Sequence, residues 1–106
     1  MRTHWVMDYE TLSNCFIAVF EDIKSEQREI FVVHESQNDI LELVEFLQGN
    51  IAREEWHVSF NGLGFDSQIT EHILRNKEQL LEQSGDTIAR FIYRKAQDVI
   101  NRSNNG

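Results

Sequence analysis

The stretch that decides the fold lies near the N-terminus and reads Trp5-Val6-Met7-Asp8-Tyr9-Glu10-Thr11. Its apolar start runs into two acids, and we interpret it as a strand whose side chains alternate between two faces. Asp8 and Glu10 should therefore share one face, with Tyr9 on the other. Two like charges held this close are unfavourable unless a cation lies between them, and such oxygen ligands suit Mg²⁺ or Mn²⁺. The alternative is an exposed strand end with two solvated acids.

Length and composition are those of an ordinary globular domain. The chain has 106 residues, of which 41% are hydrophobic and 26% are charged, so we expect one domain over residues 1–100 and a flexible polar tail over residues 101–106. The longest apolar run, residues 15–20, is too short to span a bilayer, and no signal-peptide pattern follows the first residues. One cysteine allows no internal disulfide, which favours a cytoplasmic location.

The formal net charge of −8 restricts the partners that the chain can bind by itself. Such an acidic surface repels phosphate backbones, which argues against a chain that grips nucleic acid alone. Chemistry on nucleic acid is still allowed, because a metal-dependent nuclease is acidic at its centre and a further domain or chain could supply the basic grip.

Three stretches near the N-terminus have the character of strands. The segments 15–20 and 29–34 are nearly continuous apolar runs, and short polar connections join them to each other and to residues 5–11. Short connections favour an antiparallel meander. We expect four large aromatic side chains to lie in the core, namely those of Phe16, Phe20, Phe31 and Trp56.

The hydrophobic spacing changes to that of a helix at residues 40–47, with Ser36 or Asn38 as the N-cap and Gly49-Asn50 as the stop. Residues 56–60 then alternate large apolar with polar side chains and predict a fourth strand. A strand, a crossover helix and another strand usually form a right-handed parallel unit, so the fourth strand should run parallel to one of the first three.

The fourth strand leads into a loop that reads Asn61-Gly62-Leu63-Gly64-Phe65-Asp66. If that strand pairs beside the first, Asp66 approaches Asp8 and Glu10 at the same sheet edge, where ligand sites of open sheets lie. The alternative is an ordinary loop in which Asp66 is a helix N-cap. Two helical segments follow, within residues 69–81 and 86–100, which gives an α/β or α+β domain.

Two of these motifs together resemble those of the DEDD-type 3′–5′ exonucleases. Asp8-Tyr9-Glu10 is similar to the first motif, D-x-E, and the segment 61–66 is similar to the second, which ends in an aromatic residue and aspartate. The element order is similar to the start of the ribonuclease H-like fold: three antiparallel strands, a helix, and a fourth strand parallel to the first. The resemblance covers residues 4 to about 76, and the chain most resembles the N-terminal part of a phage-type DNA polymerase or exonuclease.

The resemblance implies a two-metal site for Mg²⁺ or Mn²⁺ that hydrolyses phosphodiester bonds at a single-stranded 3′ end. Asp8 would bridge both metals, Glu10 would bind the metal that activates water, and Asp66 would hold the second metal. The substrate strand would be contacted by four further residues, namely Thr11, Leu12, Asn61 and Phe65.

The chain departs from this family after the second motif. A fifth strand and a fourth acid, in Y-x(3)-D or H-x(4)-D, are not evident. Tyr93 and Asp98 are five residues apart and do not share a helix face, so we interpret them as ordinary helix residues. We therefore expect an incomplete exonuclease domain with weak or no turnover alone.

Two other functions stay open on the sequence. The chain could be a non-catalytic interaction module that keeps a nuclease-like fold, with an exposed apolar surface where the fifth strand should be. It could also be a small acidic protein that mimics nucleic acid. A missing strand would leave a sheet edge through which the chain could self-associate.

Overall fold

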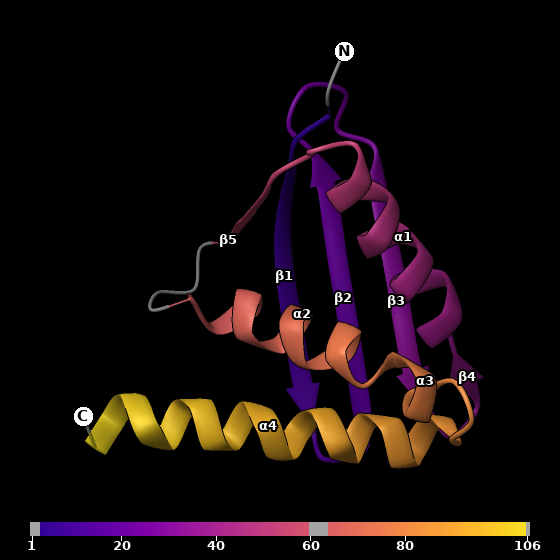
Figure 1. Ribbon diagram of the computed structural model, residues 1–106, viewed down its shortest axis with the longest axis vertical. Coiled ribbons are helices and arrows are strands. Elements are labelled where there is room, and N and C mark those ends of the chain that lie inside the picture. Colours follow the sequence, from indigo (N-terminus) through magenta and orange to yellow (C-terminus); the bar gives the residue numbers. More distant parts are fainter. Residues whose placement is uncertain (1–2, 60–63, 106) are drawn as a thin grey trace.

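The computed structural model describes residues 3–59 and 64–105, apart from the side chains of residues 103–105. Figure 1 shows the arrangement of its helices and strands. In chain order these are β1 (Trp5–Leu12), β2 (Cys15–Asp22), β3 (Arg28–His34), β4 (Gln37–Asn38), α1 (Ile40–Ala52), β5 (His57–Ser59), α2 (Phe65–Arg75), α3 (Lys77–Leu80) and α4 (Gly85–Asn105).

The strands form one mixed sheet in the order β4-β3-β2-β1-β5. β1, β2 and β3 make the expected antiparallel meander, and β5 pairs with β1 in parallel. The prediction of an α/β fold with a strand after the helix parallel to the first strand is therefore confirmed. The two-residue strand β4 was not predicted, because its residues lie where the helix cap was expected. Within residues 64–105 only helices follow β5.

The hydrophobic core lies on one face of this sheet. Trp5, Met7 and Tyr9 are buried along β1, and every second residue of β2 and β3 continues the same surface. Figure 1 shows the four helices on this side of the strands, and their buried side chains complete the core. The helical contribution includes Leu43, Leu47, Ile69, Ile73, Ile88, Ile92 and Ala96.

The start of α1 differs in detail from the expectation. The N-cap is Asp39, and its carboxylate accepts a hydrogen bond from the backbone N–H of Val32 at 2.9 Å, which holds the cap against β3. The Asn38 side chain still accepts one from the Ile40 N–H at 3.2 Å. The helix continues past the predicted stop to Ala52, because Asn50 is buried and bonded rather than free to end it.

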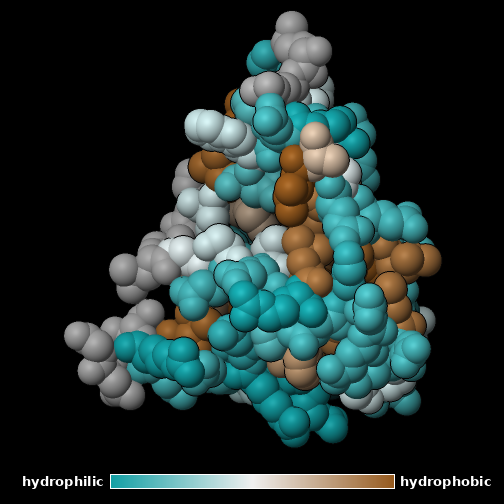
Figure 2. All heavy atoms as spheres, in the orientation of Figure 1, coloured by the Kyte–Doolittle hydropathy of each residue, from teal (hydrophilic) through white to brown (hydrophobic). Residues whose placement is uncertain are grey.

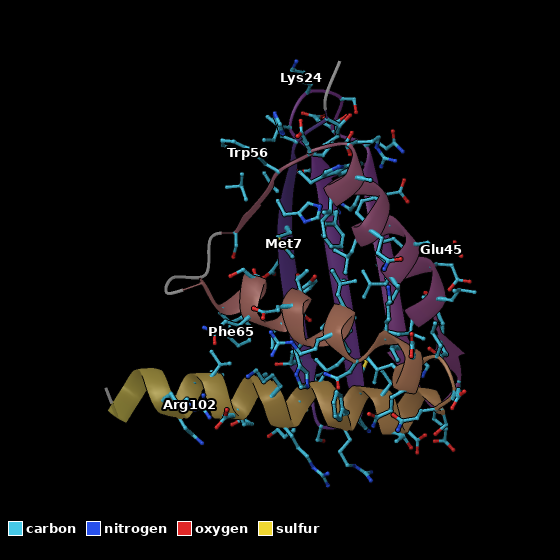
Figure 3. The ribbon with its side chains drawn as sticks, viewed as in Figure 1. Met7, Lys24, Glu45, Trp56, Phe65 and Arg102 are labelled. Atoms are coloured by element: carbon cyan, nitrogen blue, oxygen red, sulfur yellow. The ribbon has the colours of Figure 1, made fainter. Side chains whose placement is uncertain are left out.

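The later elements also depart from the sequence pattern. Trp56 is 70% exposed instead of buried, because β5 begins only at the next residue and the indole packs against His4 at the surface. Figure 3 shows Trp56 at the margin of the molecule. The helix expected within residues 69–81 is divided at Asn76 into α2 and α3. α4 continues to Asn105, through most of the expected tail.

The outer surface of the helical layer is mainly polar. Figure 2 shows hydrophilic residues over α2 and α4, with hydrophobic residues visible mainly beside α1. None of the helices in residues 3–59 and 64–105 combines the length and the apolar character that a membrane crossing requires.

A close contact joins the start of α4 to the end of β3. A Cβ atom built on Gly85 would lie 1.9 Å from the backbone carbonyl oxygen of His34. No side chain fits there unless the helix or the strand moves. Glycine at position 85 is therefore required for the packing of α4 against β3. Just before the helix, the Ser84 hydroxyl donates a hydrogen bond to the Asp86 carboxylate at 2.8 Å.

The first prediction concerns the aromatic centre of the core. Phe20 is fully buried, and its ring contacts those of Tyr9, Phe31 and Phe46. We expect Phe20→Ala to lower the free energy of unfolding by about 3–5 kcal/mol, because it removes buried surface and leaves a cavity. Urea denaturation checks this, with the exposed Ile23 as control: Ile23→Ala should change stability by less than about 0.5 kcal/mol. Equal effects of the two substitutions would contradict the placement of the core.

The second prediction concerns the two helical glycines. We expect Gly85→Ala to destabilise the fold by about 1–3 kcal/mol, because the added methyl group meets rigid backbone. Gly49→Ala is the matched control, since its nearest neighbour is the flexible end of Arg53 at 3.1 Å. This change should leave stability unaltered or raise it by up to about 1 kcal/mol through helix propensity. Thermal unfolding of both variants gives the comparison, and a neutral Gly85→Ala would mean that α4 does not press on β3.

Candidate functional site

Asp8 and Glu10 lie on the face of β1 that the helices do not cover. Both are exposed, whereas Tyr9 between them is buried. Their partners across the antiparallel pairing are Val19 and Ile17 of β2. The two carboxylates therefore share a face, as the alternation predicts, and they lie beside apolar side chains rather than among other acids.

Asp66 lies on the opposite side of the sheet. It is fully buried in the first turn of α2 and accepts a hydrogen bond from the hydroxyl of Ser59 on β5. Ser59 pairs with Met7, so its side chain points to the helix-covered face. Asp66 thus lies on the helix-covered side of the sheet, next to β5, whereas the side chains of Asp8 and Glu10 point away from the helices.

Tyr9 is the link between β1 and the surroundings of Asp66. Its hydroxyl forms a hydrogen bond with the Thr70 hydroxyl of α2 at 2.6 Å. Burial raises the pKa of the Tyr9 phenol far above its usual range; the bond to Thr70 lowers it, and the negative charge of Asp66 raises it further. Tyr9, which lies between the two exposed acids, is therefore the residue of β1 whose pKa the charge of Asp66 raises.

The structure consequently does not bring the three acids together. Among the described residues there is no group of three or more histidine, cysteine, aspartate or glutamate side chains arranged to hold a metal ion. Asp8 and Glu10 can offer two carboxylates to a divalent cation from the open face, and Asp66 does not join them in this arrangement.

The described residues that were expected to contact a substrate strand lie on two different elements, β1 and α2. Thr11 and Leu12 end β1, where Thr11 is half-buried and Leu12 is exposed. Phe65 opens α2 and packs against the core, which makes it a packing residue here. Asn61 lies outside the described residues.

A pocket lies between β1, β5 and the start of α2, on the same side as Asp66. Its volume is about 350 Å³, and it is lined by Met7, His57, Ser59, Gly64, Ser67 and Thr70. Figure 3 shows Met7 on β1 in the space between β5, α1 and α2. This pocket was not predicted from the sequence. The sequence feature that could have indicated it is the spacing of His57 and Ser59, two residues apart on one strand. When β5 pairs with β1 in parallel, both side chains point to the same side of the sheet.

His57 in this pocket is held as a neutral imidazole. The Asn50 amide nitrogen lies 2.9 Å from its Nε2, while the Asn50 carbonyl oxygen accepts a hydrogen bond from Arg53 at 2.7 Å. The amide N–H₂ therefore donates to Nε2, which must be unprotonated to accept. Burial lowers the pKa of His57, and the charge of Glu55 raises it only in part.

Comparison of the sequence with known protein families, with curated proteins and with solved structures finds no match.

The third prediction follows from His57. Its folded pKa lies below the ordinary value of 6.5, so protonation favours the unfolded chain. The stability that it contributes is complete above pH 6.5 and is lost as the pH falls from there towards the folded pKa. We expect the free energy of unfolding to decrease over this window, and His57→Gln to reduce the decrease.

Two measurements check this prediction. The pH-dependent shift of the His57 ring protons in NMR spectra gives the folded pKa, and urea denaturation at a series of pH values gives the stability. The pKa of His72 is lowered too, but its contribution is present in both proteins and cancels in the difference. A His57 midpoint at or above 6.5 would contradict the neutral, hydrogen-bonded ring.

Proposed function

We propose that the chain is the N-terminal part of a metal-dependent 3′–5′ exonuclease domain of the ribonuclease H-like class, of the proofreading type. The observation that carries the proposal is the parallel pairing of β1 with β5. It puts the strand that bears Asp8 and Glu10 directly beside the strand that leads to Asp66. The three-stranded meander, the crossover helix and this pairing agree with the element order that the resemblance implies.

The arrangement of the acids supports an incomplete site. Asp8 and Glu10 are solvent-accessible and share one face, as two ligands of a hard cation would. Asp66 is buried on the other side, and its bond from Ser59 holds it there. We therefore derive no hydrolytic step from the described geometry, and we expect the isolated chain to show weak or no turnover.

The fourth carboxylate of the family has no counterpart among the residues considered for it. Tyr93 and Asp98 both lie on α4, and Asp98 forms an ion pair with Arg102 of the same helix at 3.2 Å. Tyr93 is half-buried on the same helix. A complete nuclease would need the missing group from a further domain or chain, together with a basic surface to offset the net charge of −8.

A second candidate is a non-catalytic interaction module with a nuclease-like fold. The separation of Asp66 from Asp8 and Glu10 favours it, because acids that do not converge need not bind metal. Metal binding at Asp8 distinguishes the two candidates, because only the exonuclease requires Asp8 as a metal ligand.

The fourth prediction tests that requirement. We expect calorimetric titration with Mn²⁺ to show binding to the wild type and loss of binding, by at least tenfold in affinity, in Asp8→Ala. Glu42→Ala is the control, because Glu42 is an exposed acid on α1, on the helical side of the sheet. A single-stranded oligonucleotide labelled at its 5′ end monitors shortening from the 3′ end, which should be weak or absent.

The contrary outcomes are distinct. Absence of Mn²⁺ binding in the wild type would leave Asp8 and Glu10 as ordinary surface acids and would put the interaction module first. Equal losses in Asp8→Ala and Glu42→Ala would indicate unspecific charge effects. Strong 3′–5′ degradation by this chain alone would refute the incomplete site.

A further inference from the structure

Strands β2 and β3 are apolar on both faces along their middle. One face of β2 and β3 carries the buried core side chains, among them Phe16, Phe20 and Val33. On the other face the middle of the two strands carries Ile17, Val19, Ile30 and Val32, while Cys15 beside His34 and Glu21 beside Arg28 lie at the two ends. An antiparallel sheet with one solvated face normally alternates apolar with polar residues, whereas strands covered on both sides are apolar throughout. The sequence of these strands is that of a sheet with two covering layers.

Only one layer is present in the described part of the chain. Figure 1 shows the helices on a single side, and the uncovered face leaves Ile30 53% exposed. The register aligns this face in rows, of which Asp8–Val19–Ile30 and Glu10–Ile17–Val32 are the two central ones. We call the apolar residues of β2 and β3 on this face the open-face strip, comprising Ile17, Val19, Ile30 and Val32.

The dimensions of the strip match one helix. β2 and β3 lie about 4.8 Å apart, so two strands with their side chains present a width of about 10 Å, which is the diameter of a helix. On each strand its two residues lie about 7 Å apart, a length that a helix covers in about five residues. A helix seated there would leave β1, with Asp8 and Glu10, along its flank.

The charged residues around the strip indicate which kind of helix it can bind. Asp8 and Glu10 border the strip, and at its end Glu21 pairs with Arg28 at 3.2 Å. With Asp8, Glu10 and Glu21 against Arg28, this face carries more acids than bases, and the whole chain has a net charge of −8. A second copy would bring like charges together, whereas a cationic partner is attracted to this face.

We propose that the open-face strip binds an amphipathic helix of another protein, with its apolar stripe on β2 and β3 and its lysine or arginine flank against Asp8 and Glu10. This is the helix-in-groove mode of recognition transferred to a sheet face, where apolar contacts give affinity and the flanking charges fix orientation. The proposal does not depend on hydrolysis, and it is tested in EDTA, where no metal ion competes for the two acids.

The probe is a synthetic 18-residue helix with a leucine stripe flanked by lysine, compared with the same helix flanked by glutamate. We expect the lysine peptide to bind the wild type in calorimetry, and the glutamate peptide to bind at least tenfold more weakly. In ¹⁵N–¹H NMR spectra the amide shifts on addition of the lysine peptide should concentrate on β1, β2 and β3.

Matched variants locate the contact. Ile30→Glu should weaken binding at least tenfold, whereas Ile51→Glu should not, although Ile51 on α1 is equally exposed at 54%. Asp8→Lys with Glu10→Lys should weaken binding, and Glu42→Lys with Glu45→Lys should not. Figure 3 shows Glu45 pointing outward from α1. Each variant is accepted only if its circular dichroism and urea midpoint show a folded chain.

Four outcomes would overturn the proposal. These are no binding of the lysine peptide, equal binding of the two peptides, equal losses in Ile30→Glu and Ile51→Glu, and a wild-type dimer in light scattering that Ile30→Glu converts to a monomer. The last result would identify a second copy as the occupant. Because none of these readouts involves metal or nucleic acid, failure here leaves the exonuclease proposal to be judged by its own test.

Discussion

Strand β1 pairs with β2 in antiparallel and with β5 in parallel, and most of the structure depends on this double pairing. One side of β1 extends the meander to β3, and the other receives the strand that follows α1. The alternation along β1 then divides the molecule in two: Trp5, Met7 and Tyr9 point into the core, while Asp8 and Glu10 point away from it. A shift of one residue would exchange the two sets, so the buried aromatic rings also fix where the acids lie.

The residues that predict the fold are those whose environment is local or strongly periodic. The apolar runs at 15–20 and 29–34 identify β2 and β3, and the helical spacing from Ile40 identifies α1. Trp56 could not be placed in this way, because burial depends on where the strand actually begins. The N-cap of α1 is likewise Asp39 instead of Ser36 or Asn38, because its carboxylate accepts a hydrogen bond from Val32 of β3. Local sequence patterns do not indicate such a tertiary contact.

The candidate site was predictable only in part, for a physical reason. Within one strand the alternation sets relative orientation, so the shared face of Asp8 and Glu10 follows directly from their spacing. Between a strand and a helix across a loop no such rule holds. The side on which Asp66 lies is set by its hydrogen bond with Ser59 and by the hydrogen bond between Tyr9 and Thr70, which are tertiary contacts. The pocket around His57 escaped the sequence for the same reason, since it exists only when β5 lies beside β1.

The close approach of Gly85 to His34 has a consequence for synthesis of the chain. α4 covers β1, β2 and β3, yet it follows them by a long stretch of sequence. As the chain leaves the ribosome, the meander can pair early, but the core face of β1, β2 and β3 lacks the cover of α4 until this last helix has emerged. Such transiently exposed apolar surface is what chaperones bind and what drives misassembly. Because the seat for α4 admits only a hydrogen at residue 85, this late docking step depends on a backbone fit as well as on hydrophobic attraction.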